Sequence, residues 1–531
     1  MFFSRIYFYK RIVITILCCF SLISIFAIRS HYFFNSNRNV PSEIFNEYPY
    51  IPVIQIQSDE SPYALEWYRI WGGSYIDYGE GIAIDTNRNI YLVGSTRSFG
   101  AGYYDAFLVK YDFRGNQLWN LTWGGDNWDY GVDIATSETN IYITGLLDSF
   151  NVDAYDGFLV KYDSSGNQLW NRTWGGPDGD GFHGICINSQ KSLFLAGGTW
   201  IGNGAVLVVK YDSMGNQIWN QTWDGNDNDY GVDITVDNDD NVILAGYTQS
   251  FGTGRDFNAF LVKFDSYGKQ LWNRSWGGSA NDFGTSIAVD EGNNIYLAGY
   301  TYSSGSSYAD VFLAKFDSYG KQLWNRTWGT SSYEEICYGI IIDGNNSYIT
   351  GYIYNSIMGY RAFLAKFDSI GNEIWTIIWD LPQNSKAYHI TMDSDKNIYL
   401  TGDIETDPSV LAGHDAFFAK YGIDTDGDGL TDYVEINIYG TNPNDSDTYD
   451  DGLNDGIEVN VYYTNPKNWD TDGDGYSDGW EIQNGYNPLN YFSNLTVRVT
   501  MIVTLTLSII GISWLTFRKF KKTPKPLKLS V

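Results

Sequence analysis

The feature that most constrains the fold of this chain is a tryptophan pair, W-x-x-x-W, that recurs seven times. The second tryptophan of the pair returns every 49 to 53 residues. A period of this length indicates a repeat architecture in which each unit packs against its neighbours. The pairs are Trp67/Trp71, Trp119/Trp123, Trp170/Trp174, Trp219/Trp223, Trp272/Trp276, Trp324/Trp328 and Trp375/Trp379.

Each unit between two pairs predicts four short strands. In the first unit these are GIAID, NIYLVGS, DAFLVKYD and QLWNLTW, which are apolar or alternating and are separated by Gly, Asn and Asp turns. Four antiparallel strands in a radially repeated unit make one blade of a β-propeller. The sequence therefore predicts an all-β, seven-bladed propeller over residues 63–421.

The two ends of the array predict how the ring closes. The segment Tyr63–Trp71 is a fourth strand with no blade before it, and the seventh unit stops at Tyr421 after three strands. We expect the N-terminal strand to complete the last blade, which removes two open sheet edges.

The strings GGS-x-x-DYG-x-GIA-x-D, NIYLVG-x-T and DAFLVKYD-x-x-GNQLW resemble the prokaryotic SBBP family of β-propeller repeats, over about 64–421. The resemblance implies the propeller fold and a frequent place on exported proteins. It implies no reaction.

An acidic segment follows the propeller and carries the strongest chemical signal. DTDGDGLTDYVE begins at Asp424 and has the spacing of a calcium loop: carboxylates at positions 1, 3, 5, 9 and 12, glycine at position 6 and a backbone carbonyl at position 7. DTDGDGYSDGWE repeats it from Asp470. A degenerate middle copy has Tyr449 at position 3, which leaves its affinity in doubt unless Asp445 or Asp450 compensates. The predicted ligands are Asp424, Asp426, Asp428, Leu430, Asp432 and Glu435, then Asp447, Asp451, Asp455 and Glu458, then Asp470, Asp472, Asp474, Tyr476, Asp478 and Glu481.

The links between these loops, GTNPNDSDTYDDG and YTNPKNWDTDGDG, resemble thrombospondin type 3 repeats and related stalk repeats of prokaryotic surface proteins. That resemblance covers about 422–490 and implies loops that wrap shared calcium ions. Sixteen carboxylates stand against one lysine between Asp424 and Glu481. Because such charges repel one another unless cations neutralise them, we expect calcium to fold this stalk. A solvated, disordered acidic linker is the alternative.

Both ends of the chain predict contact with a membrane. Three basic residues precede an apolar run over 12–28, which is typical of an export signal or signal anchor within 1–30, and a linker over 31–62 follows it. Residues 495–517 contain 19 largely apolar residues, from Val499, enough for one transmembrane helix. The basic tail 518–531 places the C-terminus in the cytoplasm and the rest outside.

Other repeated positions leave two interpretations open. An acidic position opens the innermost strand of six units, and it either caps the turn between blades or forms a cation ring at the channel mouth. A lysine ends the third strand of every unit and serves either packing or a binding face. The first set is Asp77, Asp129, Asp180, Asp229, Asp282 and Glu335, with Ser385 in the seventh unit; the second is Lys110, Lys161, Lys210, Lys263, Lys315, Lys366 and Lys420.

Asparagines on the outermost strands begin N-x-S/T sequons, so these strands are either glycosylated or simply solvated. They are Asn120, Asn171, Asn220, Asn273 and Asn325. His183, His389 and His414 fall at three different unit positions with no nucleophile motif, and we interpret each as a surface or packing residue.

The sequence thus predicts a membrane-anchored cell-surface protein that presents a propeller for binding or adhesion to an extracellular glycan or surface protein. The net charge of −29 argues against a nucleic-acid partner. A polysaccharide hydrolase or lyase and a structural envelope spacer remain the alternatives, and fold alone does not separate them.

Overall fold

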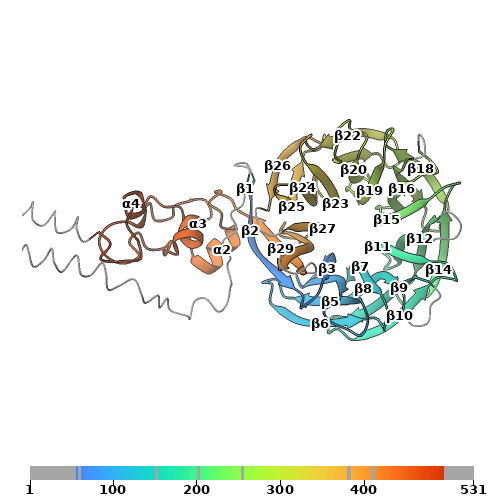
Figure 1. Ribbon diagram of the computed structural model, residues 1–531, viewed down its shortest axis with the longest axis horizontal. Helices are drawn as coiled ribbons and strands as arrows, with labels where there is room; N and C mark the ends of the chain where they lie inside the picture. The colour runs from blue at the N-terminus through green and yellow to red at the C-terminus, as the bar shows by residue number, and fades with distance from the viewer. Residues whose placement is uncertain are drawn as a thin grey trace, which may run out of the picture. The chain divides into compact units, whose positions relative to one another are not determined.

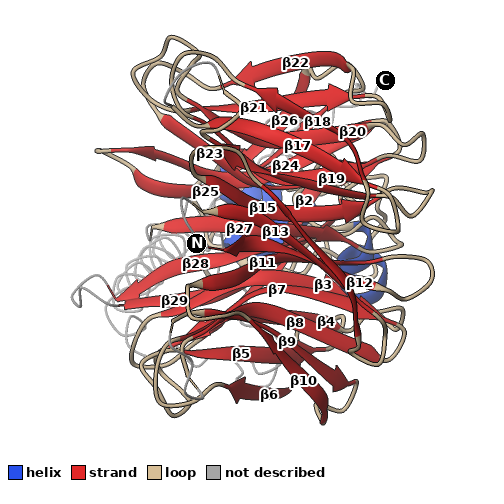
Figure 2. Ribbon diagram, turned by 90° about the vertical axis from the view of Figure 1, so that its right-hand side faces the viewer, coloured by secondary structure: helices blue, strands red, loops and turns tan. Residues whose placement is uncertain are grey.

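The computed structural model describes residues 56–57, 61–149, 154–199, 204–252, 256–379, 384–407 and 413–494. The strands form seven antiparallel sheets, which Figure 1 shows arranged in a ring. Nearly every element of this ring is a strand (Figure 2). The predicted seven-bladed propeller is confirmed.

The first three blades are β3 (Asp77–Ile84), β4 (Ile90–Thr96), β5 (Asp105–Tyr111) and β6 (Gln117–Trp123); β7 (Asp129–Ser137), β8 (Asn140–Leu147), β9 (Asp156–Asp163) and β10 (Gln168–Trp174); β11 (Asp180–Ile187), β12 (Leu193–Thr199), β13 (Ala205–Tyr211) and β14 (Gln217–Trp223). The next three are β15 (Asp229–Val236), β16 (Val242–Thr248), β17 (Asn258–Phe264) and β18 (Gln270–Trp276); β19 (Asp282–Val289), β20 (Ile295–Thr301), β21 (Asp310–Phe316) and β22 (Gln322–Trp328); β23 (Glu334–Asp343), β24 (Asn346–Asn355), β25 (Gly359–Phe367) and β26 (Glu373–Ile378).

The seventh blade closes the ring as expected. Its sheet order is β2 (Tyr63–Trp71), β29 (Gly413–Ile423), β28 (Ile398–Asp407) and β27 (Ser385–Met392). The pairing of β2 with β29 runs from Tyr63 opposite Ile423 to Trp71 opposite Ala416. A short strand within the predicted linker, β1 (Ile56–Gln57), adds to the edge of the sixth blade through β26.

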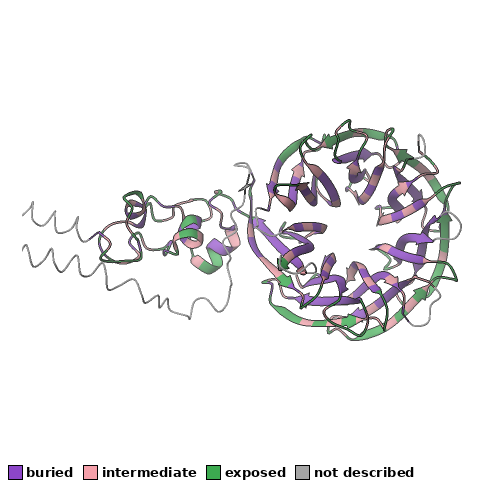
Figure 3. Cartoon of the chain, in the orientation of Figure 1, coloured by how far each residue is buried: buried purple, intermediate pink, exposed green. Residues whose placement is uncertain are grey.

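Burial explains the repeated sequence. The two middle strands β4 and β5 are buried along their whole length, whereas the outermost strand β6 alternates between exposed and partly buried positions. Figure 3 shows the same gradient around the ring, with exposed segments on its outer edge. The second strand of each unit contains L-x-G or I-T-G, and its glycine has a steric reason: a Cβ on Gly94 would lie 1.8 Å from the carbonyl oxygen of Tyr78.

The repeated lysines connect neighbouring blades. Lys110 Nζ donates to the carbonyl of Ser164, 2.8 Å away, in a hairpin turn of the next blade, and Lys161 and Lys210 repeat this contact with Ser213 and Ser266. The packing interpretation of these lysines is therefore the one the structure supports.

After β29 the chain forms three similar loops, each followed by short helical turns. These are α2 (Asp432–Val434) with the π-helical turn η1 (Glu435–Tyr439), α3 (Asp455–Ile457) with η2 (Glu458–Tyr462), and α4 (Asp478–Gln483). Thr431, Asn454 and Ser477 cap the three helices by accepting a hydrogen bond from a backbone N–H three residues later.

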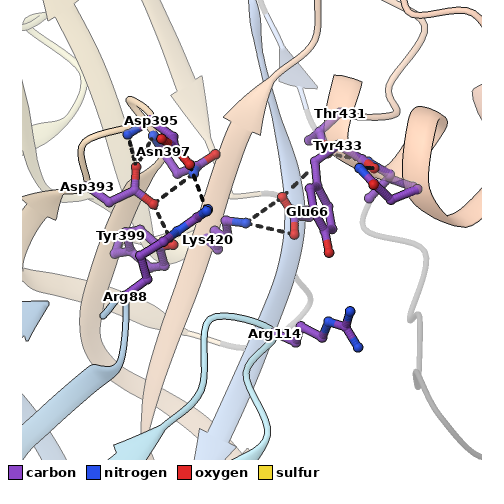
Figure 4. A network of polar contacts seen from close by, with 12 residues as sticks. Glu66, Arg88, Arg114, Asp393, Asp395, Asn397, Tyr399, Lys420, Thr431 and Tyr433 are labelled. Carbon is purple, nitrogen blue, oxygen red and sulfur yellow. Dashed lines mark hydrogen bonds and ion pairs between the residues drawn. The ribbon is translucent and has the colours of Figure 1, made fainter. Parts of the chain in front are cut away.

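A buried ion pair lies where the last strand meets the first acidic loop (Figure 4). Lys420 Nζ on β29 lies 2.8 and 2.9 Å from the two carboxylate oxygens of Glu66 on β2, and both side chains are buried. Thr431 of the first loop donates to Glu66 over 3.5 Å, and the N–H of Asp424 donates to the carbonyl of Pro62 over 2.9 Å. The first acidic loop thus contacts the strand that closes the ring.

No helix among the described residues is long and apolar enough to cross a bilayer. The predicted export signal in 1–30, the transmembrane helix in 495–517 and the basic tail 518–531 all lie outside the described residues.

Candidate metal centres and channel site

The first aspartate of each acidic loop holds the loop in its turn. The Asp424 carboxylate accepts the N–H groups of Gly427 and Gly429 at 2.8 and 3.0 Å, and Asp470 does the same for Gly473 and Gly475. All four glycines have a positive φ between 75° and 95°, a conformation that other residues adopt rarely. Glycine at position 6 of the calcium-loop pattern thus permits the sharp turn of the loop.

Carboxylates gather in four clusters, in each of which the oxygens lie within 4.8 Å of one another. Two clusters lie within one loop and use positions 1, 3 and 5. The other two join position 5 and position 12 of one repeat to position 9 of the next. The clusters are Asp424/Asp426/Asp428, Asp428/Glu435/Asp455, Asp451/Glu458/Asp478 and Asp470/Asp472/Asp474.

This grouping differs from a set of independent loops that each hold their own ion. Asp432, at position 9 of the first loop, belongs to none of the four clusters; its carboxylate accepts the N–H and Oγ1 of Thr425 at 2.9 and 2.8 Å. Asp455 and Asp478 make the same bonds to Thr448 and Thr471, and also reach the preceding repeat. Asp432 has no preceding repeat to contact, which explains why it belongs to none of the four clusters.

The middle repeat has no carboxylate cluster within its own loop, unlike the other two repeats. Tyr449 at position 3 is exposed, and Asp447 joins none of the four carboxylate clusters. Neither Asp445 nor Asp450 enters one. Asp451 and Glu458 of this repeat nevertheless contribute to the clusters that join repeats.

The predicted carbonyl ligands sit beside the clusters. The backbone N–H of Leu430 donates to Asp428 over 2.7 Å, and that of Tyr476 to Asp474 over 3.1 Å. That their carbonyl oxygens bind an ion stays a prediction.

Buried oxygens in the clusters fit a bound cation. Glu435 Oε2, Asp426 Oδ2, Asp451 Oδ2 and Asp472 Oδ2 are buried and have no hydrogen-bond donor. A buried carboxylate oxygen without a donor is costly unless a metal ion or a proton meets it. Carboxylate, amide and carbonyl oxygens are the donors that hard divalent cations prefer.

Burial, followed by the neighbouring carboxylates, raises the pKa of the Glu435 and Glu458 carboxyl groups to about 8. The same two causes raise the pKa of Glu481 to about 7, with a hydrogen bond from Ser493 opposing them. These carboxyl groups need a positive charge, a proton or a cation, at neutral pH.

Comparisons with known proteins agree with both parts of the chain. A family model described as a bacterial TSP3 repeat matches residues 424–446 and 470–490. A second, described as the SBBP beta-propeller repeat, matches residues 66–99 and 270–305. The chain carries SBBP repeats and bacterial TSP3 repeats.

Among whole proteins, the chain is 20% identical over 506 residues to an uncharacterized WD repeat-containing protein of Acanthamoeba polyphaga mimivirus. That match covers 65% of this chain and 36% of the relative, so the chain spans about a third of the relative's length.

The chain is also similar to two solved structures. A polysaccharide lyase of family PL25, an ulvan lyase, is 12% identical with a TM-score of 0.44, over 65% of this chain and 94% of that one. The propeller domain of a trilobed protease from Pyrococcus furiosus is 9% identical with a TM-score of 0.41, over 66% and 94%.

Within the SBBP propeller, the acidic position that opens each innermost strand is a turn residue. Asp77 is buried, and its carboxylate accepts the N–H of Gly73 and the hydroxyls of Thr96 and Ser98. Asp129 and Asp229 likewise accept the N–H four residues earlier, from Gly125 and Gly225. These contacts confirm the interpretation that this acidic residue caps a turn, and they do not support a cation ring.

The channel carries polar groups that sequence reasoning missed. In every innermost strand a bulge precedes one position, which is glycine in three blades and a functional side chain in four: Asp133, Asp233, Ser286 and His389. These four side chains line a cavity of about 290 Å³ whose other walls are mostly isoleucine. His389 Nε2 lies 3.8 Å from Asp133 Oδ1, and Ser286 donates to Asp233 over 2.8 Å. Burial raises the pKa of Asp133 to about 7.

A second group of polar side chains, Tyr388, Asp403 and His414, lies in the seventh blade. Asp403 is buried; His414 Nδ1 lies 2.7 Å from its Oδ2, and the Tyr388 hydroxyl donates to its Oδ1. Asp403 and Glu80 of the first blade act on one another electrostatically, and burial followed by this neighbour raises the pKa of Glu80 to about 7. His389 and His414 therefore each lie beside a carboxylate, which the sequence did not predict. Burial lowers the pKa of His183.

The two faces of the propeller differ in their aromatic side chains. In antiparallel blades, the loops between second and third strands and between successive blades lie on one face, here called the entry face; the remaining loops form the hairpin face. Among the described residues the entry-face loops expose seven aromatic side chains: Tyr75, Phe99, Tyr103, Trp128, Phe251, Tyr302 and Tyr308. Trp128 stacks on both Tyr103 and Tyr104, whose ring centroids lie 5.6 and 5.3 Å from that of Trp128.

Proposed function

We propose that this protein is a membrane-anchored cell-surface binding protein whose propeller binds an extracellular glycan through its entry face, carried on a stalk that calcium folds. The observation that supports glycan binding is the set of exposed aromatic side chains on the entry face. Sugar rings present flat C–H faces, and rigid Tyr and Trp rings bind them with little loss of conformational entropy.

The calcium step is supported by the TSP3 repeats and by the buried, donor-free carboxylate oxygens. Two of the four clusters take ligands from consecutive repeats, so an ion there would hold the repeats together. Ion binding of this kind contributes directly to folding.

The glycan step is tested with the full-length protein in detergent and polysaccharide extracted from the surface of its own cells. Trp128→Ala on the entry face is compared with Tyr267→Ala on the hairpin face, where the tyrosine is 85% exposed. We expect the first variant to lose at least tenfold in affinity and the second to bind like the wild type. Equal binding by both variants would overturn the entry face as the site.

An enzymatic function, a polysaccharide hydrolase or lyase, is favoured by a different observation. Tyr388, Asp403 and His414 form a hydrogen-bonded series in one blade, and Glu80 lies beside it. An acid with a raised pKa next to a hydrogen-bonded base is a common arrangement for proton transfer. Tyr388→Phe should then abolish the release of new sugar ends while leaving polysaccharide binding intact; no release by the wild type excludes this function.

A further inference from the structure

The third TSP3 repeat ends differently from the first two. In the first two repeats, the position-12 glutamate accepts a hydrogen bond from a threonine of the T-N-P link: Thr441 to Glu435 over 3.3 Å, and Thr464 to Glu458 over 3.0 Å. The third repeat has Tyr486 at the place of this threonine. Ser493 supplies the hydroxyl instead and donates to Glu481 Oε1 over 2.9 Å.

The aspartate that faces the position-12 glutamate is also replaced in the third repeat. Glu435 and Glu458 each face an aspartate of the following repeat, Asp455 or Asp478. Residues 482–531 contain no fourth acidic loop, and Asn494 lies there instead, donating a hydrogen bond from Nδ2 to Glu481 Oε1 over 3.4 Å. The segment after the third repeat thus brings a hydroxyl and a second polar side chain to Glu481, where a following link and repeat would bring a hydroxyl and a carboxylate.

Two oxygens at this end are buried without a donor. Glu481 and Asn494 both have 0% exposure, and Glu481 Oε2 and Asn494 Oδ1 have no hydrogen-bond partner. Asp474, at position 5 of the loop, is 4% exposed, and its negative charge acts on Glu481. Positions 5 and 12 are the same two positions that Asp428 and Glu435 supply in the first shared cluster.

We propose that Asp474, Glu481 and Asn494 form a fifth cation site, which takes a hard divalent ion such as calcium. Asn494 provides a neutral amide oxygen where the other two shared sites have an aspartate. Amide oxygens are ordinary calcium ligands, and a half-turn of the side-chain amide exchanges its nitrogen and oxygen at almost no steric cost. The inference rests on the proposed calcium binding of the repeats.

The charge of this site predicts its calcium affinity relative to the four clusters. Two carboxylates and one amide carry one negative charge less than the three carboxylates of each shared cluster. Calcium affinity rises with the number of charged ligands, so the fifth site should be the weakest of the sites that involve position 12. An ion bound here would also fix the chain at Asn494, immediately before the predicted membrane segment.

The test counts bound calcium and measures affinities on the full-length protein by equilibrium dialysis and calorimetry. Asn494→Leu keeps the size of the side chain but removes the oxygen, and Asn494→Asp restores the charge of the other shared sites. The control is Asn484→Leu, because Asn484 is exposed and donates to the carbonyl of Trp480 instead of contacting a cluster.

We expect Asn494→Leu to lose one ion per chain, Asn494→Asp to tighten the weakest site about tenfold, and the control to match the wild type. Unchanged ion number in Asn494→Leu, together with unchanged affinity in Asn494→Asp, would overturn the fifth site while leaving calcium binding by the repeats intact. A wild-type protein that binds no calcium would overturn both proposals. If Asn494→Leu does not fold, the affinity of Asn494→Asp decides alone.

Discussion

The propeller and the acidic repeats bury opposite kinds of side chain. The largest fully buried side chains of the described residues, among them Trp375, Tyr399 and Phe107, all belong to the propeller. In the repeats the buried side chains are mostly carboxylates, and their buried hydrophobic residues are only Leu430, Val434 and Leu453. The first region is stabilised by removing apolar surface from water, whereas the second needs positive charge from outside the chain.

Removing calcium should give the largest effect and should affect one region only. With a chelator present, we expect the repeats to lose their fold, because the carboxylates of the four clusters then repel one another. Limited proteolysis of the full-length protein, mapped by mass spectrometry, should show new cuts within 424–494 and none in the blades. Equal protease resistance of the repeats with and without calcium would contradict this.

A cavity in the propeller should be costly whether or not calcium is present. Phe107 is fully buried, and its ring centroid lies 4.1 Å from the ring centroid of Trp71. We expect Phe107→Ala to lower the free energy of unfolding of the propeller by about 3 to 5 kcal/mol, and Phe107→Leu by much less. Denaturant unfolding followed by tryptophan fluorescence measures this. A loss that shrinks when calcium is added would show that the two regions are not independent.

Breaking the buried ion pair at the ring closure should come next in size. Lys420→Met leaves the Glu66 carboxylate buried without its partner, which should cost about 3 kcal/mol. The matched control is Lys110→Met, because the Lys110 amine donates to the Ser164 carbonyl and its loss should cost about 1 kcal/mol. The double variant Lys420→Met with Glu66→Gln should recover much of the loss in the same unfolding measurement; equal losses in the two lysine variants would count against a special role for the pair.

The smallest effect concerns pH and lies in the propeller. The hydrogen bond to Asp403 raises the pKa of His414, with burial opposing it. The stabilisation by protonated His414 is therefore fully present below about pH 6.5, the ordinary histidine value, and is lost as pH rises through the raised pKa. Because the side chain is partly exposed, we expect less than about 1 kcal/mol. Melting temperatures across pH 5 to 9 should show this slope in the wild type and not in His414→Gln.

Much of the fold could be predicted from the sequence because each blade repeats the same local pattern of strands and turns. The tryptophan pairs and turn residues predicted the strands, and the unpaired strand at Tyr63 predicted the ring closure. The acidic loops were found for the same reason, since their spacing is local. Which carboxylates share a cluster was not, because Asp455 lies near Glu435 only after two repeats have packed.

The channel residues were missed for a related reason. Successive members of the set Asp133, Asp233, Ser286 and His389 are 100, 53 and 103 residues apart and look unrelated along the chain. Only when the seven units are aligned at the bulge do they fall at one position, where other blades have glycine. An alignment of the units at that position, and not the search for a nucleophile motif, would have revealed them.

The register of the closing strands has a mechanical consequence. Tyr63 pairs with Ile423, so Pro62 and Asp424 lie side by side at the same end of the β2–β29 ladder. A tension that pulls Pro62 and Asp424 apart would load the ladder one hydrogen-bonded pair at a time, beginning at that end. A tension that acts on both residues in the same direction would leave the ladder unloaded, and the seven blades would move as one rigid body.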